Sequence, residues 1–415
     1  MNPLRSIGVL TIGNVISQGI AILGIIILSR FYTSSNFGSY AVVLGFVNIV
    51  SSISSFRYEV TILLPKKINI SMLAVKVSLL NSVSVCLTVL IAILFFIYIG
   101  LLELFWLIVP FAAFFSSIIN IASYLQNRQK NYLWMTFLQV SRSFLFVLLA
   151  LIFSTRFSIN NGLLLSMLGS LFVPAILIVS FDFRKSNLFK RNISKREFLF
   201  WLKKNKKFFC YSTPAVFVSS VASQAPVFLL SYFISDSLAG YYSIVQRVVI
   251  APVVLISSSV NRVYMQAVTS KLSKGEDIYI FTRKIIKYFI FPSVVIASIM
   301  VLFFNYRLLE FFLGKEWSGI DAFAVVMIPA FLISFIAKSV SGFAVLNKNE
   351  VGLIYQVVLL VMVSLSVMLS SMLFESEVCI FISISLALTV SFTGQVISIL
   401  LISKKIDGNR YKRSI

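Results

Sequence analysis

Long apolar stretches separated by short polar loops recur along the whole chain. A helix of about 20 apolar residues spans the hydrocarbon of a bilayer, and twelve of the stretches reach that length. The pattern therefore predicts an all-α membrane protein with twelve transmembrane helices. The predicted spans are 7–30, 37–64, 73–99, 104–126, 131–154, 160–181, 209–233, 238–262, 285–305, 321–345, 351–374 and 378–402.

The densest run of charge lies in the middle of the chain, between two blocks of six spans. Lys and Arg cluster from Phe183 to Arg196 and again from Lys203 to Lys207. Basic loops of this kind are retained in the cytosol during membrane insertion. We therefore predict four parts: a six-helix bundle over 1–181, a basic cytosolic linker over 182–208, a second six-helix bundle over 209–402 and a basic cytosolic tail over 403–415.

The two halves repeat each other in sequence. The segment Leu28–Tyr40 aligns without a gap on Leu230–Tyr242, with identical residues at six positions. The two segments lie an even number of spans apart, so both halves have the same orientation in the membrane. The sequence thus predicts two parallel-repeat six-helix bundles, with the substrate site expected between the halves.

Composition excludes a soluble globular protein. The 415-residue chain is 59% hydrophobic and 12% charged, whereas soluble domains carry about 25% charged residues. The net charge of +22 does not indicate a nucleic-acid partner, because Lys and Arg are concentrated in alternate loops. The basic loops are the cytosolic ones, so both termini are predicted to be cytosolic. Trp106, Trp134 and Trp317 each begin a span, where interfacial aromatic residues are expected.

Histidine and cysteine usage excludes several kinds of site. The chain has no histidine, which rules out histidine metal sites and Ser-His catalytic pairs. Cys86, Cys210 and Cys379 lie in apolar stretches without paired spacing, which argues against a disulfide framework or a zinc cluster. No cofactor or metal is expected.

Within the basic middle, Phe198, Trp201 and Leu202 lie among lysines at helical spacing. Two interpretations fit this pattern. One is an amphipathic helix resting on the inner leaflet, and the other is a solvated positive loop.

Several motifs resemble those of a known transporter family. The runs 208–215, 223–230 and 240–247 read FFCYSTPA, SQAPVFLL and GYYSIVQR. They look like the start of the second half of polysaccharide transporters, the O-antigen-type flippases of the multidrug/oligosaccharidyl-lipid/polysaccharide exporter superfamily. The run 57–66, RYEVTILLPK, resembles the inner end of their second span, and 127–130, NRQK, resembles their fourth loop.

The resemblance implies a flippase in the bacterial plasma (inner) membrane. Members of the family move an undecaprenyl-pyrophosphate-linked sugar repeat unit from the inner to the outer leaflet. The implied partners are this lipid-linked oligosaccharide and membrane lipids, with other glycan-assembly membrane proteins as candidates. Such a passenger requires a polar path with cations for its phosphates, and arginine suits phosphate because its planar fork donates two parallel hydrogen bonds.

Among the basic residues within predicted spans are Arg142, Arg247, Arg262 and Lys338. An ionised group costs at least about 2.5–3.5 kcal/mol in the hydrocarbon, so it should face a polar cavity. Arg142 is nearly central in its span, with Gln139 on the same stripe. We expect it to bind substrate, with a structural role capping a buried carbonyl or serine as the alternative. Arg247 and Lys338 are expected to do the same, with snorkelling to an interface as the alternative.

Uncharged polar residues trace a compatible lining on three spans. Helical spacing places each set on one face. Hydrogen bonding between helices is the alternative role for every one of them. The sets are Asn14, Ser17 and Gln18; Ser116, Asn120 and Ser123; and Thr213, Ser220 and Gln224.

Charges near the ends of spans are candidates for a gate or an interface. Arg30, Arg57 and Arg262 are expected to anchor at the membrane surface. Glu59 is the one carboxylate that approaches the hydrocarbon, and with Arg57 it forms either a gate pair or a surface charge. Residues two apart on a helix do not face each other, which argues against the pair.

Other functions remain open on sequence grounds. A drug or ion antiporter of the same superfamily usually has a carboxylate deep in its bundle. A polysaccharide polymerase or ligase needs a large outer loop, and the predicted outer loops are short. A non-transporting scaffold in a glycan-assembly complex is the remaining alternative. We expect the chain to be a transporter and not an enzyme, working by alternating access through a cationic central cavity.

Overall fold

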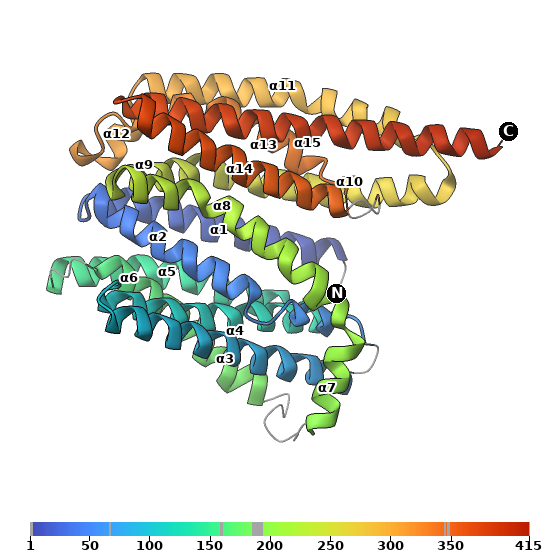
Figure 1. The fold of residues 1–415 in the computed structure, drawn as a ribbon, viewed down its shortest axis with the longest axis horizontal. Helices are drawn as coiled ribbons and strands as arrows, with labels where there is room; N and C mark the ends of the chain where they lie inside the picture. The colour runs from blue at the N-terminus through green and yellow to red at the C-terminus, as the bar shows by residue number, and fades with distance from the viewer. Residues whose placement is uncertain are drawn as a thin grey trace. The chain divides into compact units, whose positions relative to one another are not determined.

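The computed structural model describes residues 3–65, 68–157, 161–184, 194–343, 346 and 349–414. Within these ranges the chain is helical and contains no strand. Eleven helical segments are long and apolar enough to cross a membrane by length and composition. The protein is an all-α membrane protein, as its hydropathy pattern predicts (Figure 1).

The chain packs as two compact units, called here unit 1, Met1–Val221, and unit 2, Ala222–Ile415. The helices of unit 1 are α1 Pro3–Leu28, α2 Ser34–Ile53, η1 Tyr58–Leu63, α3 Ile68–Tyr98, η2 Leu104–Leu107, α4 Ile108–Gln129, α5 Tyr132–Phe157, α6 Gly162–Leu177, η3 Ile178–Phe183, α7 Lys195–Lys204 and η5 Phe208–Ser212. The boundary falls inside α8 Thr213–Phe233. Unit 2 continues with α9 Asp236–Val245, η6 Gln246–Ile250, α10 Ala251–Lys274, α11 Ile278–Asn305, α12 Leu308–Leu313, η7 Lys315–Trp317, α13 Ile320–Ser339, α14 Asn349–Leu373 and α15 Glu377–Ser414.

The predicted span 238–262 is a helical run of three parts. α9 is followed by the π-helical segment η6 and then by α10. The run is not among the eleven segments. The three parts follow one another without a break, so together they are long enough to be the twelfth span.

The internal repeat is visible in the turns that the aligned segments form. Thr33 caps the start of α2 by accepting a hydrogen bond from the Asn36 N–H. Ser235, the aligned residue, caps α9 in the same way by accepting from the Leu238 N–H. A hydroxyl at this position satisfies a backbone donor that the helix leaves unpaired. The repeated sequence therefore builds the same helix start in both units.

The second predicted span, 37–64, is wrong at its end. Helix α2 stops at Ile53, and the chain then turns into the short 3₁₀ helix η1. Phe56 and Arg57 have φ angles of 50° and 60°, a left-handed conformation that an α-helix cannot contain. Apolar residues continue through the turn, so hydropathy alone extends the span past its true end.

Helices α1 and α5 pack closely because small residues line their contact. A Cβ added at Gly13 would lie 2.2 Å from Cγ2 of Thr136, and one at Gly24 would lie 2.2 Å from Cγ2 of Val147. Between these positions the Ser17 and Ser143 hydroxyls are hydrogen-bonded at 2.7 Å. Small residues and hydroxyl pairs are the usual means of helix association in lipid, where apolar burial gives no advantage. We call this contact the α1–α5 seam.

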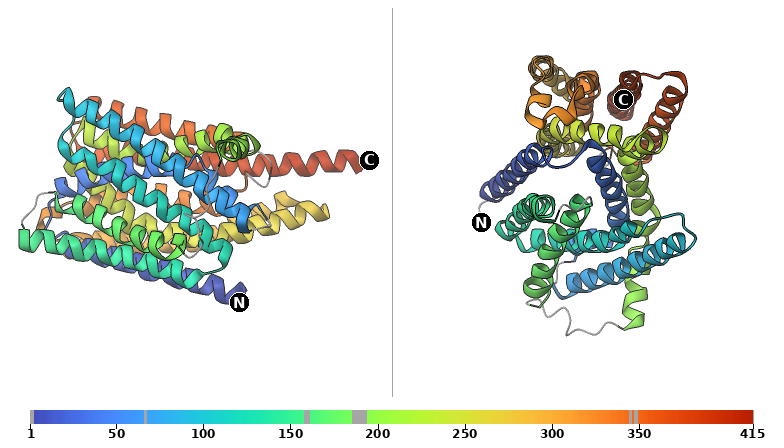
Figure 2. Two further views of the ribbon diagram at one scale, coloured as in Figure 1. Left: turned by 90° about the horizontal axis from the view of Figure 1, so that it is seen from below. Right: turned by 90° about the vertical axis from the view of Figure 1, so that its left-hand side faces the viewer.

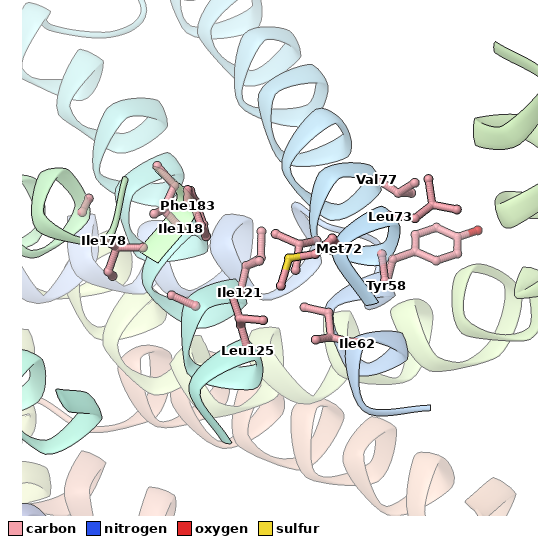
Figure 3. Packing of buried hydrophobic residues seen from close by; sticks show 14 of the residues in the cluster. Tyr58, Ile62, Met72, Leu73, Val77, Ile118, Ile121, Leu125, Ile178 and Phe183 are labelled. Carbon is pink, nitrogen blue, oxygen red and sulfur yellow. The ribbon is translucent and has the colours of Figure 1, made fainter. Parts of the chain in front are cut away.

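The core of unit 1 gathers where η1 meets α3 and α4. Figure 3 shows Tyr58 and Ile62 of η1 beside Met72 and Leu73 of α3 and Leu125 of α4. All five side chains are buried. The core thus fastens the turn after α2 to two long helices.

Helix α7 in the basic middle belongs to the same core. Ser194 and Glu197 form a reciprocal capping box at its start. Trp201 is 5% exposed, and Phe198 and Leu202 pack beside it in the cluster. The helix is therefore present, and its Phe198–Trp201–Leu202 face packs on protein. The interpretation as a solvated loop is wrong for residues 195–204, and a position of the helix on the inner leaflet stays a prediction.

In unit 2, the starts of two helices are hydrogen-bonded to carboxylates of other helices. Asp321 of α13 accepts hydrogen bonds from the backbone N–H groups of Leu309 and Glu310 at the start of α12, at 3.1 and 2.8 Å. Asp407 accepts from Ile278 and Tyr279 at the start of α11, at 3.0 and 2.7 Å. Asp407 lies on α15, a single 38-residue helix that runs unbroken to Ser414 (Figure 2). A negative charge at a helix start is stabilising.

We expect Asp407→Ala to lower the stability of unit 2 by about 0.5–2 kcal/mol, the usual cost of a lost helix cap. Thermal unfolding of the detergent-solubilised protein measures the change. Glu375→Ala is the matched control, because Glu375 is exposed in the loop before α15 and has no described partner. Equal melting temperatures for the two variants would contradict the capping role.

Candidate cationic site

Arg142 lies near the middle of α5, in a span that runs from Tyr132 to Arg156. Its side chain is half-buried, and the next residue in the sequence, Ser143, belongs to the α1–α5 seam. Tyr40 of α2 lies close enough to the guanidinium to interact with it electrostatically. The Tyr40 ring stacks on Phe146, with ring centroids 5.4 Å apart. Within the described part of the chain, Arg142 has neither a carboxylate nor a hydrogen-bond partner. Among the described residues it is a cation near the middle of a span without a counter-charge.

Three of the predicted polar residues lie near this arginine along the seam. Asn14 and Gln18 are within one turn of Ser17 on α1, and Gln139 is about one turn before Ser143 on α5. All three side chains are half-buried. The hydroxyl contact therefore brings the polar positions of the first and fifth spans to one level of unit 1.

This arrangement suits a phosphate ligand. A guanidinium with open donors can form two parallel bonds to phosphate oxygens, and neutral amides can donate further bonds without competing for the anion. The position is costly for a purely structural arginine, since an unpaired charge in a span loses several kcal/mol of hydration. Asn120 does not join the group: it is exposed on α4 and has no described contact with the α1–α5 seam.

The predicted cations of unit 2 lie on three elements. Arg247 is half-buried in the π-helical segment η6, and Gln224 is half-buried on α8. Lys338 is half-buried in the last turn of α13, and the described residues give it no partner. Arg262 is exposed on α10 beside Asn261, whose amide donates to the Ser339 and Ser341 carbonyls at 3.2 and 2.9 Å. Lys338 and Arg262 therefore lie at the same end of unit 2.

Arg57 and Glu59 form an ion pair in the turn after α2. The Arg57 Nη1 to Glu59 Oε1 distance is 3.1 Å, and the Ser55 hydroxyl also donates to the Glu59 carboxylate. Glu59 is 5% exposed. The helical-spacing argument against this pair is wrong, because the left-handed Phe56 and Arg57 turn the chain back on itself. Arg30 is exposed in the turn after α1.

Sequence reasoning missed a second arginine that holds the same turn. Arg128, near the end of α4, donates to the Ile62 carbonyl at 2.9 Å and to the Pro65 carbonyl. Its partners are backbone carbonyls at the end of η1, which no side-chain pattern reveals.

No group of three or more His, Cys, Asp or Glu side chains that could hold a metal occurs among the described residues.

A family model for polysaccharide biosynthesis proteins matches residues 4–265. The match includes α1, α2 and α5 and extends through Arg247 and Arg262. This chain belongs to the polysaccharide biosynthesis protein family. The resemblance seen in the motifs of the sequence is thereby confirmed, and no individually curated protein matches the sequence.

Solved transporters share the fold of this family member. A structure of the lipid II flippase MurJ in an inward closed conformation superposes with a TM-score of 0.74 at 12% identity, covering 97% of this chain and 90% of that one. An inward-facing multidrug resistance MATE family transporter of the MOP superfamily gives 0.66 at 14% identity, with 98% and 96% covered. A MOP superfamily transporter from Pyrococcus furiosus gives 0.59 at 16% identity, with 99% and 97% covered. At these identities the likeness shows the fold alone.

Proposed function

We propose that this protein is a flippase for a lipid-linked oligosaccharide. Its substrate is an undecaprenyl-pyrophosphate-linked repeat unit of an O-antigen or a similar glycan, moved from the inner to the outer leaflet of the bacterial plasma membrane. Family membership and the likeness to the lipid II flippase support the general class. The observation that carries the proposal is Arg142, a cation in a span without a described anion.

In this mechanism Arg142 binds the pyrophosphate of the substrate. Gln139, Asn14 and Gln18 supply neutral donors and acceptors along the same seam. Arg247, Lys338 and Gln224 of unit 2 bind the substrate at a further stage as the two units alternate between inward and outward access. The protein itself makes and breaks no covalent bond.

The proposed membrane placement follows from charge. The basic middle and the basic tail face the cytosol, so both termini are cytosolic. Arg30, Arg57 with Glu59, and Arg262 then lie near the surfaces, where they control entry or anchor the helices. Other glycan-assembly membrane proteins that make or consume the substrate are its proposed neighbours.

A second candidate function is antiport of drugs or ions, because the MATE transporters share the fold. The distribution of carboxylates disfavours it. Every Asp or Glu in the eleven described spans lies within one turn of a span's end, as Asp182, Asp321 and Glu350 do. An antiporter of cations usually needs a carboxylate deep in the bundle. The surplus of cations at depth instead favours an anionic passenger.

Reconstitution into sealed vesicles tests the proposal. The vesicles contain a polyprenyl-pyrophosphate oligosaccharide labelled on its sugar, and an impermeant lectin measures how much label reaches the other leaflet. We expect the protein to accelerate this transfer over empty vesicles. Transport of a cationic dye without transfer of the glycan would establish the antiporter instead.

A further inference from the structure

An open groove of about 810 Å³ lies at one end of unit 1, where α5 begins and η3 ends. This is the end that carries the basic middle, and it is predicted to face the cytosol. The volume is within the range of small-molecule sites. The groove is lined by Asn131, Leu133, Trp134, Phe137, Ser180, Phe181 and Asp182.

Three aromatic rings form two walls of this groove. Trp134 and Phe137, one turn apart on α5, are stacked with centroids 5.4 Å apart and an interplanar angle of 16°. Phe181 of η3 meets the indole edge-on, at 6.1 Å and 74°. Phe137 and Phe181 are 52% and 59% exposed, so their faces are available to a ligand. Aromatic faces at such an angle attract an ammonium group.

A carboxylate lies against these rings. The indole N–H of Trp134 donates to Oδ2 of Asp182 at 3.0 Å, which holds the carboxylate at the edge of the groove. The flanking charges are positive: Lys130 precedes Asn131 and Arg184 follows Asp182 by two residues, both exposed. Negative charge inside the groove and positive charge around it complement a zwitterion with an ammonium at its tip and a phosphate behind.

We propose that this groove binds a phospholipid with a primary ammonium headgroup, phosphatidylethanolamine. The ammonium lies against Trp134, Phe137 and Phe181 and pairs with Asp182. The phosphate faces Lys130 and Arg184, and the acyl chains leave over Leu133, which is 62% exposed. A tryptophan at the start of a span lies at headgroup depth, the level at which a lipid headgroup can reach it. The site is separate from the α1–α5 seam and does not depend on the proposed transport function.

Native mass spectrometry of the full chain tests the site. The delipidated protein is mixed with equal amounts of phosphatidylethanolamine and phosphatidylglycerol, which differ in the ammonium group. We expect phosphatidylethanolamine to be retained preferentially. Asp182→Asn and Phe181→Leu should each reduce its retention about three- to tenfold. Asparagine keeps an acceptor for the Trp134 indole, and Phe181 is exposed, so both variants should fold.

Glu103→Gln is the matched control. It neutralises an exposed acid at the opposite end of α4 from the groove and should leave lipid retention unchanged. Equal retention of the two lipids by the unmodified protein would overturn the proposal. Undiminished phosphatidylethanolamine retention in either groove variant would also overturn it, because the ammonium site requires both the carboxylate and the aromatic wall.

Discussion

Arg142→Ala will reduce transfer of lipid-linked oligosaccharide across vesicles about ten- to hundredfold, while the amount of folded protein stays the same. Hydrogen bonds to a charged group contribute about 1.5–3 kcal/mol, which corresponds to that range of affinity. Folding should be unaffected because no described residue depends on Arg142 for a hydrogen bond or ion pair. Initial rates of lectin-accessible label measure the effect.

Two further variants serve as a conservative substitution and a control for Arg142→Ala. Arg142→Lys should retain part of the activity, since lysine keeps the charge but loses the two parallel donors. Arg156→Ala removes an exposed arginine from the last turn of the same helix and should transport like the unmodified protein. Full transport by Arg142→Ala would exclude this residue from substrate binding.

The second large effect is expected at Gly24 in the α1–α5 seam. Gly24→Ala places a methyl group 2.2 Å from Cγ2 of Val147, and such overpacking costs about 1–3 kcal/mol. Alanine also gains about 1 kcal/mol over glycine in a helix, so the net change is smaller than the clash alone. Thermal unfolding in detergent should therefore show a lower melting temperature for this variant.

A substitution at Gly19, on the same helix, separates the steric clash from the gain in helix propensity. An added Cβ at Gly19 meets nothing within 4 Å, so Gly19→Ala receives the helical gain without the clash and should melt higher. Adding Val147→Ala to Gly24→Ala should restore stability, because it removes the atom that the new methyl meets. A higher melting temperature for Gly24→Ala itself would mean that the helices can separate at no cost.

Much of this fold could be predicted because lipid imposes a simple rule. Backbone groups in a bilayer must be paired within a helix, so apolar length translates directly into spans. The repeat was equally accessible, since Thr33 and Ser235 align in sequence and both cap a helix. The family motifs agree with the matched model over residues 4–265.

Hydropathy fails where the chain turns within an apolar run. Nothing near Phe56 and Arg57 signals a break, because neither glycine nor proline supplies the left-handed turn. Tertiary contacts hold it instead, through Arg128 and the buried Glu59. The contacts of Trp317 were also missed: it is fully buried in protein and packs edge-on against Tyr241, with ring centroids 5.4 Å apart. Its neighbours are distant in sequence, so spacing could not place it.

The candidate site was predictable in kind but not in its contacts. A central arginine in an apolar span stands out in any sequence, and Arg142 is half-buried without a described partner. The bond between Ser17 and Ser143 joins residues 126 positions apart, and no local pattern specifies it. The groove around Trp134 was missed for the same reason, since Asp182 reaches the indole from another helix.

The cysteines can be used to determine the orientation of the protein in a vesicle membrane. Cys210 is exposed on the π-helical turn η5, just after the basic middle, whereas Cys86 is buried within α3 and Cys379 is half-buried at the start of α15. With Cys379 replaced by serine, a membrane-impermeant maleimide would label Cys210 from one face of a sealed vesicle. The chain thus carries a native reporter of sidedness, and sorting vesicles by that label would separate right-side-out from inverted molecules before any transport is measured.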